Sequence, residues 1–221
     1  MSALLPIFPL PGVVLFPGAD LPLHIFENRY RTMIRMALPV REPIGMVLLQ
    51  PGYESEYEGA PPIHPVGCAG EIIRCDPLPD GRFNLLLRGL WRFRVLEEDR
   101  ALPFRRVSYR RLDDPPSDIA QRALESQVKR ELLSAFLSLG ALLQGREMEG
   151  APDTPPVGLD ELVNQLAFAW PGPAERKQEL LTTEGALERG LRLKRLLEAD
   201  ADEMRLSRGL PAPLADGSRI H

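Results

Sequence analysis

The chain has few of the residues from which catalytic and metal sites are commonly built. Among its 221 residues are two cysteines, three histidines and three lysines. Cys68 and Cys75 form neither a disulfide framework nor a zinc-binding spacing. His24, His64 and His221 are scattered, without a partner at metal-ligand spacing. We therefore expect no metal, no cofactor and free, at least half-buried thiols that suit a reducing compartment.

The sequence also lacks the motifs of nucleotide and peptide hydrolysis. No glycine-rich segment is followed by the Lys and Ser or Thr of a phosphate-binding loop, and there is no Gly-x-Ser-x-Gly nucleophile motif. Lys129, Lys177 and Lys194 lie on predicted helix surfaces in charged surroundings, where nothing lowers a lysine pKa toward that of a catalytic base. The sequence predicts a chain that is not an enzyme and has no catalytic residues.

Long apolar runs and a strong charge of either sign are missing as well. No run approaches the roughly 18 apolar residues of a membrane-spanning helix, and the apolar N-terminus lacks the basic start of a signal peptide. The net charge is −4, and residues 1–116 carry 14 basic and 14 acidic side chains. We expect a soluble, cytoplasmic protein without membrane contact, and nucleic acid is not the expected partner.

The most informative segment that is present covers residues 6–30. It is strongly apolar and is interrupted by five prolines. Proline fixes φ and lacks a backbone donor, so these prolines confine the segment to short extended pieces at strand starts, edges and turns. The segment is too apolar for a linker, and only a larger fold can order it.

The first half of the chain has a strand-like pattern from Leu4 to Leu112. About six short apolar runs are separated by turn signals, among them Leu78-Pro79-Asp80-Gly81. Short connections between about six strands favour a small barrel-like sheet. One helix is inserted at 26–38, where apolar residues recur at helical spacing until Leu38-Pro39.

The second half is helical. The strand-like pattern ends at Asp113-Asp114-Pro115-Pro116. Beyond it, apolar residues at helical spacing predict helices over 119–143 and 159–170. Two shorter helices follow, and the last of them ends near Ala199. Six strands followed by about four helices predict an α+β fold with segregated helices. We expect a sheet subdomain over 1–114, a helical subdomain over 115–200 and a disordered tail over 201–221.

An arginine-bearing group suggests one function. Arg88, Arg92, Arg94 and Arg105 are interleaved with aromatic residues, which is a pattern of sheets that bind RNA. Acidic residues 97–99 lie in the same hairpin, and alternation favours a solvated outer face for these arginines. The RNA-binding interpretation is therefore kept as the alternative.

Several motifs together resemble one known family. Phe8-Pro9-Leu10, residues 14–18 and residues 22–27 are similar to the opening signature of the Lon N-terminal domain family, the substrate-recognition module of the Lon ATP-dependent proteases. Residues 66–73 and 78–89 are similar to its later strand and hairpin motifs. The resemblance runs in order from about Leu4 to about Ala199.

The resemblance implies a PUA-like barrel and a module that recognises unfolded or degron-bearing polypeptides, or a protein partner, in protein quality control. Since the ATPase and peptidase modules are missing, we expect a free-standing, non-catalytic recognition domain. Unfolded polypeptide is bound through exposed apolar surface and sheet edges. The candidate polypeptide-binding residues are Val13, Phe16, His24, Phe26 and Arg29, although for any single apolar residue of this segment the sequence favours a place in the core over a place on the binding surface.

Overall fold

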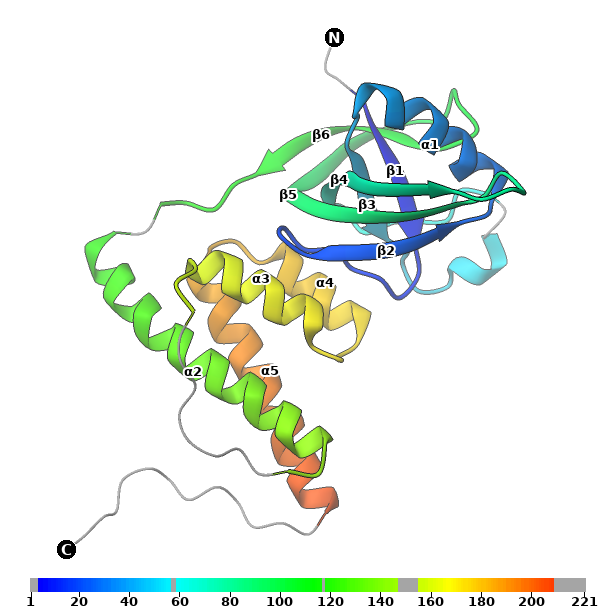
Figure 1. The fold of residues 1–221 in the computed structure, drawn as a ribbon. Helices are drawn as coiled ribbons and strands as arrows, with labels where there is room; N and C mark the ends of the chain where they lie inside the picture. Colours follow the sequence, from blue (N-terminus) through cyan, green and yellow to red (C-terminus); the bar gives the residue numbers. More distant parts are fainter. Residues whose placement is uncertain (1–3, 57–58, 117, 147–154, 209–221) are drawn as a thin grey trace, which may run out of the picture.

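The computed structural model describes residues 4–56, 59–116, 118–146 and 155–208, and in these ranges strands precede a group of helices (Figure 1). The strands are β1 (Leu5–Leu10), β2 (Asp20–Ile25), β3 (Ile44–Leu48), β4 (Val66–Pro77), β5 (Phe83–Asp99) and β6 (Arg106–Leu112). The α-helices are α1 (Asn28–Val40), α2 (Ile119–Leu143), α3 (Leu159–Ala169), α4 (Ala174–Thr182) and α5 (Ala186–Ser207). The predicted α+β class is confirmed, and the boundary between 114 and 115 stays a prediction.

The six strands form one sheet in the order β2-β5-β4-β3-β1-β6, and β5 also pairs with β6. The β1–β3 pair is parallel, and the other pairs are antiparallel. This arrangement is possible because β5 is 17 residues long. Its first half pairs with β2 and its second half with β6, while β4 runs along most of its length. The PUA-like barrel stays a prediction.

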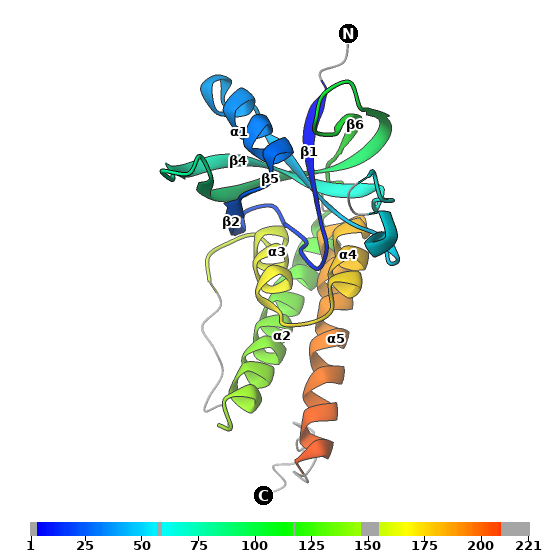
Figure 2. The ribbon, with the colours of Figure 1, turned by 90° about the vertical axis from the view of Figure 1, so that its right-hand side faces the viewer.

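Helix α1 covers one side of the sheet, and α2–α5 lie on the other (Figures 1 and 2). Tyr30, Met33, Ile34 and Ala37 recur at helical spacing and are buried. The sequence predicted that α1 ends at Leu38, but the helix runs to Val40. A proline in the last turn removes one backbone donor without preventing the turn, and α1 ends where Arg41 adopts a left-handed φ of 52°.

Helices α2 and α5 run side by side away from the sheet (Figures 1 and 2). The predicted range 119–143 of α2 is confirmed, and Asp118 caps it by accepting from the Gln121 backbone amide. The prediction of a disordered tail from 201 is wrong as far as 207, because α5 continues there and buries Ala201. Residues 209–221 of the predicted tail lie outside the described residues.

A charged cluster joins the sheet to the helices. Arg92 on β5 and Arg189 on α5 are 3% and 1% exposed, and both bind the carboxylate of Asp114, at 2.6 and 2.5 Å. Arg92 also donates to the carbonyl oxygens of Leu181 and Thr183, at 2.9 and 2.8 Å. Three segments far apart in the sequence therefore meet at one carboxylate.

The two arginines also set the protonation of that carboxylate. Desolvation raises the pKa of Asp114, but the hydrogen bond and charge of Arg189, and then the charge of Arg92, outweigh it and hold the pKa below the usual 3.8. A lowered carboxyl pKa means that its ionic interactions stabilise the fold fully above the unfolded-state pKa, and are lost as the pH falls through the lower folded-state pKa.

We predict that Asp114→Asn destabilises the protein by about 3 kcal/mol near pH 7, because it leaves two buried guanidinium groups without their shared anion. Urea denaturation followed by circular dichroism measures the free energy of unfolding. The difference from the unsubstituted protein should be constant above about pH 4 and should shrink below it.

Asp113→Asn is the matched control, because Asp113 pairs with Arg111 on the surface and both side chains are more than half exposed. Its cost should stay below about 1 kcal/mol. Equal costs for the two substitutions would contradict the role assigned to Asp114.

A close backbone approach fixes the proline-rich N-terminal segment against β5. The amide of Gly18 donates to the carbonyl of Gly89, and the amide of Gly89 donates to the carbonyl of Ala19, both at 2.9 Å. A Cβ atom on Gly89 would lie 2.1 Å from the carbonyl oxygen of Phe16. Glycine is therefore required at position 89 by the neighbouring backbone.

We predict that Gly89→Ala lowers the free energy of unfolding by about 2 kcal/mol, because backbone must move to admit the methyl group. Gly140→Ala is the control: its Cβ meets nothing within 4 Å, and it lies in α2. That variant should gain roughly 0.5–1 kcal/mol. Thermal unfolding of both proteins tests the pair, and two shifts of the same sign would contradict the packing described here.

Candidate functional site

The apolar N-terminal segment divides into a buried and an accessible part. Phe16 is 0% exposed and belongs to the main core, together with Val14 and Leu15. The side chain of Phe16 fills the core, so in this conformation it cannot contact a ligand. Val13 is half-buried and packs against the same core.

The accessible part lies around the end of β2. Phe26 is 59% exposed, and its ring stacks on the exposed imidazole of His24 at 6.2 Å between centroids. His24 Nδ1 lies 2.7 Å from Asn84 Oδ1, and Arg82 Nη1 lies 3.3 Å from His24 Nε2. The structure thus brings His24 and Phe26 together as one amphipathic surface beside the start of α1.

Arg29, the remaining residue of the predicted set, is half-buried at the N-terminal end of α1. Its guanidinium binds Glu27 at 2.7 Å and lies over the ring of Tyr30, at 4.9 Å from the centroid. These contacts lie within the first turn of α1 and its N-cap residue Glu27. They leave Arg29 with its charge already paired.

The arginines of the alternative RNA-binding face do not form an open basic surface. Arg92 is buried in the cluster with Asp114, which corrects its predicted place on a solvated face. Arg88 forms a bidentate pair with Asp20, at 2.7 and 2.8 Å. Arg105 is mostly buried between Glu98 and the carbonyl of Pro61, and Arg94 is half-buried. RNA binding is therefore not favoured.

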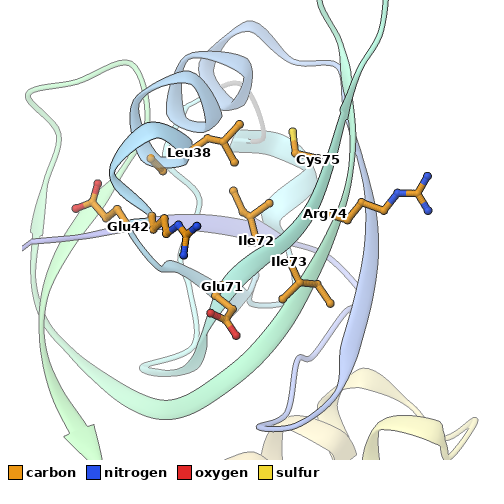
Figure 3. Close-up of a pocket in the computed structure, with 9 residues that line it drawn as sticks. Leu38, Glu42, Glu71, Ile72, Ile73, Arg74 and Cys75 are labelled. Atoms are coloured by element: carbon orange, nitrogen blue, oxygen red, sulfur yellow. The ribbon is translucent and has the colours of Figure 1, made fainter.

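A cavity of about 520 Å³ lies between the C-terminal end of α1 and β4 (Figure 3). Its apolar lining comprises Ala37, Leu38, Ile72, Ile73 and Cys75, and its charged lining comprises Arg41, Glu42, Glu71 and Arg74. Leu38 and Ile72 point toward one another across it, and Arg74 points away (Figure 3). Burial and the nearby Asp76 carboxylate raise the pKa of the Cys75 thiol, so it contributes to the lining as a neutral group.

Sequence reasoning missed this cavity, although two signals pointed to it. Met36, Leu38 and Val40 are apolar, yet they fall outside the buried stripe of α1, and each is at least 39% exposed. Consecutive apolar residues Ile72 and Ile73 in one strand also cannot both face the core by alternation. A register shift between Ile72 and Arg74 accommodates them.

No group of three or more His, Cys, Asp and Glu side chains within the described ranges could hold a metal ion. No helix among those residues is both long and apolar enough to cross a membrane. Both cysteines are free, with Cys68 buried and Cys75 half-buried, as the sequence predicted.

Curated relatives of the chain are bacterial Lon proteases. The Lon protease of Anaeromyxobacter dehalogenans is 29% identical over 210 residues, which cover 90% of this chain and 23% of the relative. The Lon protease of Cytophaga hutchinsonii is 24% identical over 214 residues, which cover 93% of this chain and 25% of the relative. The chain therefore spans about a quarter of the length of these relatives.

Solved structures of similar chains show the same fold. The Lon N-terminal domain protein from Xanthomonas campestris matches with a TM-score of 0.59 at 24% identity, over 88% of this chain and 97% of that one. The N-terminal domain of the Mycobacterium avium complex Lon protease matches with a TM-score of 0.64 at 15% identity, over 91% and 99%.

The family model of the ATP-dependent protease La (LON) substrate-binding domain matches residues 4–199. These limits agree with the range from about Leu4 to about Ala199 over which the sequence motifs run in order. The chain belongs to the LON substrate-binding domain family.

Proposed function

We propose that the protein is a non-catalytic module that recognises unfolded or degron-bearing polypeptides, or a protein partner, in protein quality control. The match of residues 4–199 to a substrate-binding domain is the observation that carries this proposal. A cytoplasmic place of action, a PUA-like barrel as the scaffold and a role without bound cofactor belong to the same proposal.

The surface of the sheet part supports this function. Unfolded chains differ from folded ones in exposing apolar side chains and unpaired backbone, so a general receptor needs apolar surface rather than a fixed set of polar contacts. Phe26 is widely exposed, and Leu38 and Ile73 are each 39% exposed beside the α1–β4 cavity. Apolar groups are thus available at both ends of α1.

Of the residues predicted from the sequence, we propose that His24 and Phe26 contact the polypeptide. Their stacked rings offer an apolar face with a polar rim, which suits a side chain of mixed character. Val13 and Arg29 are half-buried and stay proposed members of the binding site. Phe16 contributes to the core alone.

We predict that the protein binds reduced, alkylated α-lactalbumin and does not bind the native, disulfide-bonded form at the same concentration. Fluorescence anisotropy of the labelled ligand measures the dissociation constant. The physical reason is that only the unfolded form presents apolar side chains and free backbone groups together. No binding of the unfolded form at high micromolar concentration, with this protein correctly folded, would rule out polypeptide recognition.

We further predict that Phe26→Ser weakens binding of the unfolded ligand about fivefold to tenfold, because the exposed ring no longer contributes apolar area to the contact. Leu96→Ser is the matched control, since Leu96 is equally exposed, at 59%, but lies near the far end of β5. The same loss in both variants would show that the effect is not specific to the His24–Phe26 surface.

A further inference from the structure

Strand β4 has a free edge over part of its length. On the side opposite β5, β3 pairs with residues Cys68, Ala69 and Gly70, and its first residue, Ile44, lies opposite Gly70. Residues 71–77 continue to pair with β5. Among the described residues, no other segment forms a backbone hydrogen bond with 71–77. Half of the backbone donors and acceptors of this stretch therefore face away from the sheet.

The α1–β4 cavity lies beside this edge. Its β4 lining is the stretch 71–75, and its other wall is the C-terminal end of α1 together with Arg41 and Glu42, just before β3 begins. The cavity therefore occupies the space that β3 would fill if it continued along β4. Figure 3 shows Leu38 of α1 and Ile72 of β4 facing one another from the two walls of this cavity.

The chemistry of the lining indicates what the space accepts. Its walls carry apolar groups from Leu38, Ile72 and Ile73, and its charged groups are two arginines and two glutamates. Arg74 points away from the cavity and pairs with Asp76, which leaves Arg41 beside Glu42 and Glu71. With charges of both signs around it, the cavity does not require a charged ligand. An exposed strand edge pairs with an extended backbone, and an apolar pocket beside that edge binds an apolar side chain.

We propose that an extended polypeptide segment adds to residues 71–77 of β4 as a further strand and places an apolar side chain between Leu38 and Ile72. This inference rests on the proposed function and names the site and the mode of binding. Backbone pairing supplies affinity without sequence selectivity, and the cavity supplies the preference for an apolar residue. Both properties suit a receptor for unfolded chains.

A second copy of the same chain is a poorer occupant. The register shift at Ile73 bends the edge, and Arg74 and Asp76 stand on it as exposed charges, which are features that oppose long edge-to-edge pairing between folded sheets. A flexible peptide adapts to a bent edge, whereas a rigid sheet does not. The proposal is therefore limited to an unstructured segment.

The direct test uses the unsubstituted protein and two chemically matched peptides. A labelled peptide of about ten residues that alternates Val with Ser is long enough to span the edge at ~3.3 Å per residue. In one derivative the backbone nitrogen of every Val is methylated. In the other derivative the backbone nitrogen of every Ser is methylated. Because these nitrogens face opposite edges of an extended peptide, one derivative should lose at least about tenfold in affinity while the other stays within about twofold.

A variant tests the cavity independently. Leu38→Glu places a charge in the apolar space and should weaken the unmethylated peptide at least about tenfold. Met36→Glu is the control, because Met36 is 49% exposed on the same helix and does not line the cavity. Circular dichroism verifies that both variants fold, and light scattering reports whether Leu38→Glu changes the oligomeric state.

The outcomes separate this inference from the proposed function. If unfolded α-lactalbumin binds but the two methylated peptides have equal affinity, polypeptide recognition stands and strand addition at β4 is overturned. If the unsubstituted protein is a dimer and Leu38→Glu dissociates it, a second copy of the chain occupies the edge of β4. That result also overturns the proposal. If neither the peptide nor unfolded α-lactalbumin binds, the proposed function itself fails.

Discussion

The carboxylate of Asp114 is the contact on which the relation between the sheet and the helices depends. It lies two residues after the end of β6, and it binds one arginine from β5 and one from α5. Two buried guanidinium groups repel each other and have lost their hydration, so their burial requires this anion between them. The carbonyls of Leu181 and Thr183 complete the coordination of Arg92 and bring the α4–α5 connection to the same point. One acidic residue thereby links parts of the chain that are otherwise separate in sequence.

Sequence patterns predicted the elements well where a local rule decides them. The range of α2 follows from helical periodicity, and the β4–β5 hairpin follows from Leu78-Pro79-Asp80-Gly81. The helical stripe does not stop at the polar residues after Ala199, which is why α5 is longer than predicted. In α1, a proline in the last turn leaves most of the hydrogen-bond ladder intact, so the helix passes the predicted end.

The site could be predicted only in part, because it depends on contacts between distant segments. The alternation of apolar and polar residues along β5 predicted a solvated Arg92. No local sequence pattern reveals that its partner is Asp114, 22 residues later. Phe16 and Phe26 have similar apolar surroundings in the sequence, yet the backbone contact with Gly89 holds the first in the core and the second lies on the surface. The α1–β4 cavity combines residues about thirty positions apart, and the free edge beside it exists because β3 pairs with only three residues of β4.

The two proposed contact surfaces lie at opposite ends of α1. A helix of 13 residues spans about 20 Å at 1.5 Å per residue, which an extended segment of six or seven residues covers. One unfolded polypeptide can thus reach both the His24–Phe26 surface and the edge of β4. Hydrogen exchange of the full chain, with and without saturating reduced, alkylated α-lactalbumin, tests this account most directly. It predicts protection within 20–41 and 71–77 and unchanged exchange in α2–α5; protection confined to α2–α5, or none at all, would contradict it.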